Sequence, residues 1–218
     1  MRYHTVLWDL DGTLVDSSPG VRTALAAACA AAGVPMLPEE EFWRSMGPAV
    51  RDNARINFGL SGDREERFVE TFLEIYAALP WERSGSLYPG IFTLLGRLTD
   101  AKIKSAVCTM KDEKSAVEML TSYDVSPFFE TIAGVDDAAP CRKEETIADC
   151  MLRLGVPWRE GVLMVGDTLL DAEAAAKAGV DFAAALWGFG FGHGELARCS
   201  AVCAAETPEE LGRFLLER

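Results

Sequence analysis

The fold is decided by the stretch Val6-Leu7-Trp8-Asp9-Leu10-Asp11-Gly12-Thr13. It begins with an apolar run typical of a buried strand, and two carboxylates and a turn-forming glycine follow directly. Because alternate side chains of a strand project to the same side, we expect Asp9 and Asp11 to lie together at the end of the strand. Two acids so close repel each other unless a cation or a shared proton intervenes. The stretch therefore predicts a metal site, a division of roles between nucleophile and general acid–base, or both.

A second apolar run also ends in acids. It reads Val162-Leu163-Met164-Val165-Gly166, and Asp167 follows it directly. Asp171 comes four residues later, which places it on the same face of a following helix. The alternative interpretation is that Asp167 only caps that helix. Two separate strands that end in acids favour one shared site.

Two further candidate residues lie in the sequence between these two apolar runs. The apolar run at 103–108 ends at Thr109, and Lys143 stands at the start of a later helix, with Arg142 as a rival cation. Each residue taken alone is structural more often than functional, and its place in the series is what makes it a candidate. The four segments, in this order, resemble the haloacid dehalogenase-like hydrolase superfamily, whose members are mostly phosphatases. The resemblance is strongest to members of the phosphoglycolate phosphatase type.

The resemblance implies a role for each of these side chains. Asp9 would be the nucleophile that attacks phosphorus, and Asp11 would protonate the leaving group and then activate the hydrolytic water. A Mg²⁺ ion, the implied cofactor, would be held by Asp9, the main-chain carbonyl of Asp11 and Asp167. Asp171 would lie behind these ligands or reach the ion through a water molecule. The residues implied to bind the phosphoryl group are Gly12, Thr109, Met110 and Lys143.

The sequence also departs from the family pattern. Met110 stands where relatives often carry an asparagine, and the prolines that often flank the lysine are absent. Asp11 distinguishes branches of the family, because an acid there suits cleavage of a P–O ester and is missing from the dehalogenases. Residues 18–84 contain no lysine for the Schiff base of the phosphonate-cleaving branch, and the mutase branch's histidine segment is absent.

Composition agrees with a globular enzyme. The chain has 218 residues, of which 49% are hydrophobic and 25% charged, and its net charge of −13 argues against a nucleic-acid partner. No apolar run approaches the ~20 residues of a membrane helix, and no targeting segment is visible. The cysteines are scattered without the spacing of a disulfide framework. We expect a cytoplasmic protein, a monomer or homodimer without membrane contact.

The pattern of elements predicts an α/β fold with a doubly wound, mainly parallel sheet of the Rossmann type. Strands are expected near 4–9, 103–108, 130–134, 162–166 and 181–185, with helices between them. Residues 17–84 read as helix and loop, with a helix expected to begin at Pro38-Glu39-Glu40-Glu41 and a capping box at Asp63 and Glu66. We therefore expect a catalytic core at 1–16 and 85–218 and an inserted helical cap at 17–84. The Gly/aromatic stretch 187–194 either lines the site entrance or is a mobile turn.

The predicted function is a Mg²⁺-dependent phosphomonoester hydrolase that acts through an aspartyl-phosphate on a small phosphorylated metabolite. A phosphoglycolate-like substrate is favoured. The cap is expected to select the substrate, and Arg51, near Arg44 and Arg55, is its candidate for binding a carboxylate or second phosphate. Three alternatives stay open: a phosphotransferase or mutase, a pyrophosphatase, and a non-catalytic phosphate-binding relative.

Overall fold

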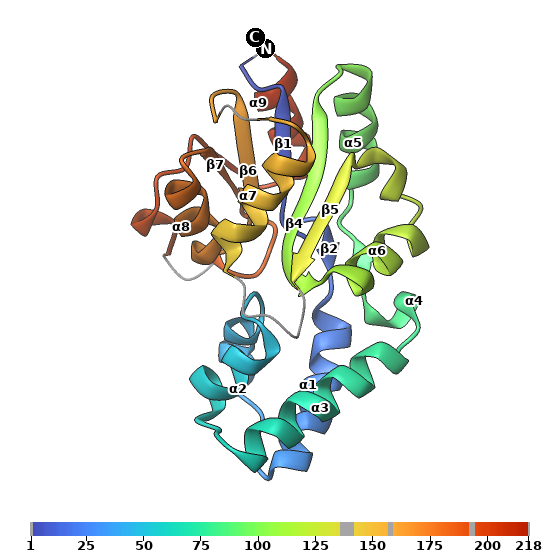
Figure 1. Cartoon of the computed structure of the whole chain (residues 1–218), viewed down its shortest axis with the longest axis vertical. Helices are drawn as coiled ribbons and strands as arrows, with labels where there is room; N and C mark the ends of the chain where they lie inside the picture. Colours follow the sequence, from blue (N-terminus) through green and yellow to red (C-terminus); the bar gives the residue numbers. More distant parts are fainter. Residues whose placement is uncertain (1, 136–141, 157–158, 192–194, 218) are drawn as a thin grey trace. The chain divides into compact units, whose positions relative to one another are not determined.

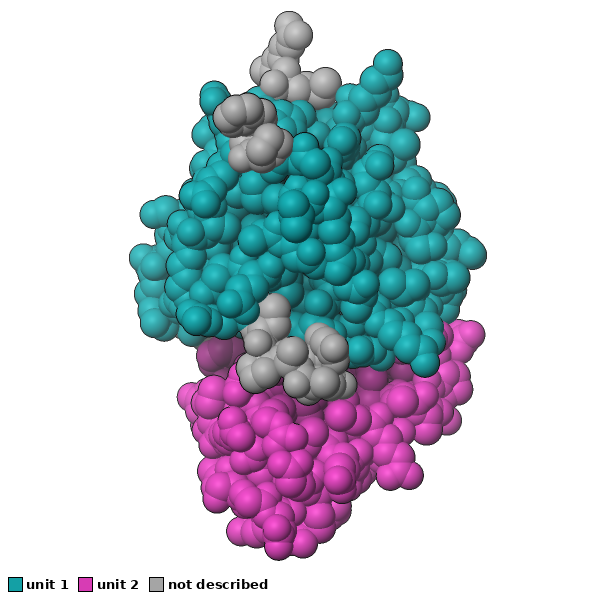
Figure 2. All heavy atoms as spheres, viewed as in Figure 1, with its two compact units in different colours: residues 1–15, 87–218 teal, residues 16–86 magenta. Residues whose placement is uncertain are grey.

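The computed structural model describes residues 2–135, 142–156, 159–191 and 195–217. The chain forms two compact units, residues 1–15 with 87–218 (unit 1) and residues 16–86 (unit 2), coloured separately in Figure 2. The first boundary, between residues 15 and 16, lies one residue before the predicted one. The second, between residues 86 and 87, lies two residues after the predicted one.

Unit 1 contains a six-stranded sheet in the order β5-β4-β1-β6-β7-β8, and every neighbouring pair is parallel. Its strands are β1 (Thr5–Trp8), β4 (Lys104–Asp112), β5 (Thr131–Val135), β6 (Val162–Gly166), β7 (Asp181–Ala185) and β8 (Cys203–Ala205). The predicted doubly wound sheet is confirmed, and the structure adds a short edge strand, β8, that was not predicted. The strand order reverses at β1, and open α/β sheets bind ligands at the carboxyl ends of strands beside such a point.

Helices cover both faces of this sheet. They are α5 (Ile91–Asp100), α6 (Glu113–Ser122), α7 (Lys143–Arg153), α8 (Leu169–Ala178) and α9 (Pro208–Leu216), with short 3₁₀ turns at Ser126–Phe128 and Glu195–Arg198. α7 packs against β4, β5 and α8, while α5 packs against α9 (Figure 1). Successive residues of β1 are therefore buried whichever face they point to, as Leu7 and Trp8 are. This explains why the strand reads as an unbroken apolar run.

Unit 2 is helical. It comprises α1 (Ser18–Ala32), a 3₁₀ helix (Glu39–Ser45), α2 (Val50–Phe58), α3 (Asp63–Ala78) and α4 (Trp81–Ser84). α1 and α3 pack along each other, and the α3 stripe that includes Phe68 and Phe72 is buried. The chain passes between the units through β2 (Val15–Asp16) and β3 (Ser86–Leu87), which pair as a two-stranded sheet.

Two local expectations for unit 2 are wrong. No capping box forms at Asp63, because α3 begins at that residue, and its N-cap is Gly62, which has no side chain to cap with. The helix expected from Pro38 is only a 3₁₀ segment, and α2 was not predicted. None of the helices in the described ranges combines the length and apolar character needed to cross a membrane.

Two helical glycines differ in the space around them, which yields a stability prediction. A Cβ added at Gly96 in α5 would meet nothing within 4 Å, whereas at Gly20 in α1 it would lie 2.7 Å from the Ser84 carbonyl oxygen. Gly96→Ala should raise the free energy of unfolding by about 0.5–1 kcal/mol, because alanine restricts the unfolded chain. Gly20→Ala should lower it by about 1–3 kcal/mol through overpacking. Urea denaturation of both variants checks this, and equal shifts would contradict it.

Candidate active site

The turn after β1 presents the first two acids. The N–H of Asp9 donates to the carbonyl of Val165 at 2.9 Å, which continues the pairing of β1 with β6 beyond the strand. Gly12 follows in a left-handed conformation, with a φ of 89°. A Cβ at Gly12 would lie 2.3 Å from Oδ2 of Asp167, so only glycine fits beside that carboxylate. The turn therefore lies directly against the end of β6.

Three buried carboxylates meet at this edge of the sheet. Asp9 follows β1, Asp167 follows the adjacent parallel strand β6, and Asp171 lies in the first turn of α8. One oxygen from each lies within 4.8 Å of one from both others. Asp171 is held in place by a capping box, in which it accepts hydrogen bonds from the N–H and hydroxyl of Thr168 and returns its own N–H to that hydroxyl.

A buried lysine joins two of the three acids. Lys143 begins α7, and its Nζ donates to Oδ1 of Asp9 and lies 2.9 Å from Oδ1 of Asp171. Its side chain is only 2% exposed. The rival cation Arg142 is exposed, and it lies 3.6 Å from Glu144. Of the two candidates, Lys143 is the one that the fold brings to the carboxylates.

Burial and like charge dominate the electrostatics. Burial raises the pKa of Asp9 to about 7, and nearby Asp171 adds to the effect while Lys143 opposes it. Burial also raises the pKa of Asp167 well above its usual range, and the charges of Asp171 and Asp9 raise it further. Burial acts to lower the pKa of Lys143, but the neighbouring carboxylates outweigh it and raise that pKa on balance. Without a bound metal ion, Asp9 and Asp167 therefore remain protonated at pH values at which exposed carboxylates are ionised.

The donor set fits a divalent metal ion. Within the described parts of the chain, no lysine or arginine forms an ion pair with Asp167, although it is fully buried. When all three carboxylates are ionised, the one ammonium of Lys143 leaves two negative charges uncompensated. Clustered carboxylate oxygens are the ligands that hard cations such as Mg²⁺ prefer, and neutralisation removes much of the cost of burying them.

Asp11 is held apart from this cluster by a different lysine. Its Oδ2 lies 3.1 Å from Nζ of Lys111, while its Oδ1 is buried without a hydrogen-bond partner among the described residues. The main-chain N–H of Lys111 also donates to the hydroxyl of Thr109 at 3.1 Å. The register of β4 shifts between Cys108 and Asp112, so the strand pattern did not indicate that Lys111 reaches Asp11. An acid with one free oxygen is suited to exchange a proton with a ligand.

The remaining predicted residues differ in their surroundings. Met110 lies in β4 between Thr109 and Lys111 and is partly exposed. Arg51 belongs to unit 2, where its guanidinium pairs with Glu65 at 2.7 Å and Glu66 at 2.6 Å. A ligand that used Arg51 would have to compete with these carboxylates.

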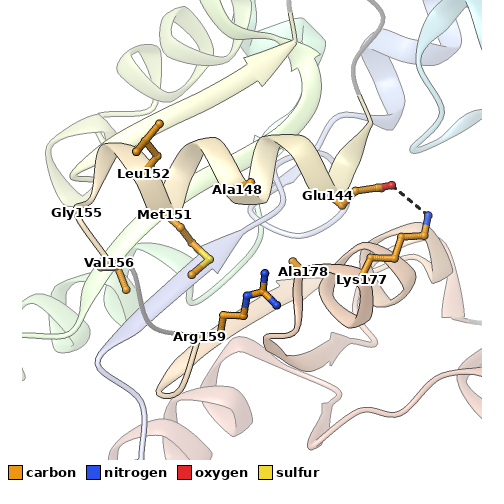
Figure 3. A pocket seen from close by; sticks show the side chains of 9 residues that line it. All are labelled: Glu144, Ala148, Met151, Leu152, Gly155, Val156, Arg159, Lys177 and Ala178. Carbon is orange, nitrogen blue, oxygen red and sulfur yellow. Dashed lines mark hydrogen bonds and ion pairs between the residues drawn. The ribbon is translucent and has the colours of Figure 1, made fainter.

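A pocket of 590 Å³ lies between α7 and α8, outside the acid cluster (Figure 3). Its lining is largely apolar, and the ion pair of Glu144 with Lys177 closes one part of it. It contains none of the predicted site residues, although Glu144 directly follows Lys143. The chemistry of the chain is thus concentrated at the carboxyl ends of β1 and β6 rather than in this pocket.

Comparison with known proteins places this geometry in a family. Residues 6–185 match the family described as haloacid dehalogenase-like hydrolase. A phosphoglycolate phosphatase from Caulobacter vibrioides is 33% identical over 81% of this chain and 76% of its own length. The tyrosine-protein kinase PtkA from Mycobacterium tuberculosis is 33% identical over 85% of this chain. The matched region spans only 62% of the length of PtkA.

Solved structures agree. A haloacid dehalogenase-like family hydrolase from Streptococcus pneumoniae has a TM-score of 0.88 and 28% identity, and the match covers 98% of this chain and 99% of that one. The structure of Mycobacterium tuberculosis PtkA has a TM-score of 0.83 and 30% identity, covering 100% of this chain and 99% of that one. The sequence-based assignment to this family is therefore confirmed.

The raised pKa of Asp9 predicts how pH affects the metal-free protein. The folded state binds this proton more tightly than the unfolded state, so the contribution favours folding at low pH. It should be lost as the pH rises from about 4, the value in unfolded chains, to about 7. In EDTA, the free energy of unfolding should fall over this range, and Asp9→Asn should reduce the fall by an amount on the order of a few kcal/mol. Thermal unfolding at a series of pH values measures both, and parallel curves for the two proteins would contradict the assignment.

Proposed function

Because the chain belongs to the haloacid dehalogenase-like hydrolase family, we propose that it is a Mg²⁺-dependent phosphomonoester hydrolase that acts through an aspartyl-phosphate. One observation carries the proposal: Asp9 contacts a buried lysine within a carboxylate cluster, while Asp11, two residues later, keeps one oxygen unbonded. The first arrangement suits a nucleophile and a phosphate site, and the second suits a general acid–base.

The covalent step uses Asp9. A carboxylate oxygen of Asp9 forms a bond to phosphorus as the bond from phosphorus to the ester oxygen breaks, and the alcohol leaves. Asp11 gives its proton to the departing oxygen, which would otherwise leave as an alkoxide. Asp11 then takes a proton from water as that water attacks phosphorus, which regenerates Asp9 and releases inorganic phosphate. One acid thus serves both half-reactions.

The surrounding cations bind and orient the phosphoryl group. Lys143 compensates negative charge beside Asp9, and Thr109, whose oxygen already accepts from Lys111, retains its hydroxyl proton for donation to a phosphoryl oxygen. Lys111 orients the carboxylate of Asp11. Asp9, the main-chain carbonyl of Asp11 and Asp167 would hold Mg²⁺, with Asp171 nearby. When bound, the ion supplies neutralisation of the charge on phosphate and carboxylates.

The substrate proposed is a small phosphorylated metabolite, with a phosphoglycolate-like carboxylate favoured. Relatives about one-third identical carry the name phosphoglycolate phosphatase, which supports this class. We propose that unit 2 acts as a cap domain that selects the substrate, since the unit 1 residues described above bind only phosphate and metal. Arg51 is its candidate for the substrate carboxylate, in exchange for one of its present partners.

A second candidate function is transfer of the phosphoryl group to a tyrosine hydroxyl. The observation that favours it is the 33% identity to PtkA, which is named a tyrosine-protein kinase. The same aspartyl-phosphate would then be attacked by a phenol oxygen instead of water, with Asp11 accepting the phenol proton. The two functions share a nucleophile and differ only in the acceptor.

The hydrolase proposal predicts Mg²⁺-dependent release of phosphate from a panel of small esters that includes 2-phosphoglycolate and pyrophosphate. EDTA should abolish the release. Asp9→Asn should lower kcat by at least about 10⁴-fold because the nucleophile is gone. Asp11→Asn should lower it by about 10²–10⁴-fold, with a phosphoenzyme that forms and decays slowly. Phosphate assays and trapping of the phosphoenzyme measure these effects.

Gly96→Ala serves as the control, because the space around Gly96 is open and the residue lies in α5, which contributes none of the candidate site residues. Its activity should equal that of the wild type. Phosphate release that persists in Asp9→Asn would rule out the covalent mechanism. Binding of phosphate and Mg²⁺ without any turnover would leave a non-catalytic relative.

The choice of acceptor has its own test. With ATP and a tyrosine-containing protein, we expect release of phosphate to water and no phosphotyrosine. The reason is that a hydrolase uses water as the phosphoryl acceptor and therefore needs no surface that recognises a tyrosine-containing protein. Phosphotyrosine that accumulates with the wild type and disappears with Asp9→Asn would establish the second function instead. An antiphosphotyrosine blot beside a phosphate assay separates the two outcomes.

A further inference from the structure

The Gly/aromatic segment that follows β7 makes direct contacts with the acid cluster. The sequence predicts that this segment, 187–194, either lines the site entrance or is a mobile turn, and residues 192–194 lie outside the described residues. Its first part, Trp187-Gly188-Phe189-Gly190, is described and packs on the end of β6 and on the turn after β1. We call these four residues the clamp loop.

The clamp loop contacts Asp167 through its main chain. The N–H of Phe189 donates to Oδ2 of Asp167 at 2.8 Å. The other oxygen, Oδ1, accepts the hydroxyl of Thr13 at 3.2 Å. A donor on each oxygen fixes the rotation of the carboxylate, and each oxygen retains a lone pair for a cation. Asp167 is thus oriented by neutral groups that leave its charge uncompensated.

The loop also acts on Asp167 indirectly, through Thr13. The indole N–H of Trp187 donates to the main-chain carbonyl of Thr13 at 2.9 Å. Thr13 is the residue whose hydroxyl binds the other oxygen of Asp167. One short loop therefore supports both of the donors that hold this carboxylate.

The packing distances show that the loop lies directly against Asp167, with no room for a side chain at its two glycines. A Cβ at Gly188 would lie 2.3 Å from Cβ of Asp167 and 2.3 Å from the carbonyl oxygen of Gly12. A Cβ at Gly190 would lie 2.4 Å from the carbonyl oxygen of Asp167. Neither of these glycines has the left-handed φ that favours glycine, so close approach rather than backbone conformation excludes a side chain.

We propose that the clamp loop is a positioning element for the metal site, which sets the affinity for Mg²⁺ by holding Asp167 through Phe189 N–H and Thr13. The inference rests on the proposed function, because it takes Asp167 as a ligand of the ion. Groups that orient a metal ligand commonly alter metal affinity by about 10–100-fold when they are changed. The loop supplies one of these groups itself, the main-chain N–H of Phe189, and supports the other, Thr13, through the indole of Trp187.

The test compares the intact wild-type protein with Gly188→Ala, Trp187→Phe and the control Gly96→Ala. Calorimetric titration with Mg²⁺ gives the dissociation constant, and thermal unfolding in EDTA gives the stability without metal. We expect Gly188→Ala to weaken Mg²⁺ binding by about 10–100-fold and Trp187→Phe by about tenfold. Gly96→Ala should bind as the wild type does. With Mg²⁺ well above the weakened dissociation constants, kcat should recover in both loop variants, because Asp9 and Asp11 are intact.

A purely structural loop would give a different result. Its variants would unfold at lower temperature in EDTA but bind Mg²⁺ as tightly as the wild type, and that outcome would overturn the inference. Trp187→Phe decides the question if Gly188→Ala does not fold. The wild type and Gly96→Ala report on the proposed function itself. If they bind no Mg²⁺, that function fails and the inference fails with it, whereas unaltered binding in the loop variants defeats the inference alone.

Discussion

Mutual repulsion of buried carboxylates is the constraint on which the rest of this structure depends. Asp9, Asp167 and Asp171 share one edge of the sheet, and among the described residues Lys143 is the cation bonded to two of them. Burial raises the pKa of Asp9 and of Asp167, so that ionising this cluster costs more free energy than ionising exposed acids. A divalent cation bound among these carboxylate oxygens would relieve the repulsion and reduce the cost of burying them.

The fold concentrates these charges by bringing main chains unusually close. β1 and β6 are adjacent and parallel, so the residues that follow them meet at one edge. Glycine at positions 12, 166 and 188 then allows this approach, since a Cβ at each would overlap Asp167 or Asp171. In the capping box of α8, one oxygen of Asp171 accepts a hydrogen bond from Thr168, and the other lies 2.9 Å from Nζ of Lys143. Ordinary helix-capping geometry thereby positions a carboxylate of the candidate active site.

The division into two units would separate the chemistry from the substrate selection that we propose for unit 2. The candidate nucleophile, acid–base, cations and metal ligands all belong to unit 1, and the two chain crossings into unit 2 lie at β2 and β3. A phosphoryl-transfer centre built this way can serve different acceptors. Relatives at the same level of identity are accordingly named phosphoglycolate phosphatase and tyrosine-protein kinase. We infer that differences in function among such proteins arise outside the carboxylate cluster.

The sequence by itself determined the family, the parallel α/β core and the identity of the acids, because apolar runs that end in Asp9 and Asp167 are local patterns. It did not distinguish Lys143 from Arg142, since both lie at one helix start and only packing buries one of them. Tertiary structure alone decided the pairing of Lys111 with Asp11, which depends on an irregularity in β4. It also decided the role of Phe189, whose main-chain N–H is common to almost every residue and therefore leaves no signal in the sequence.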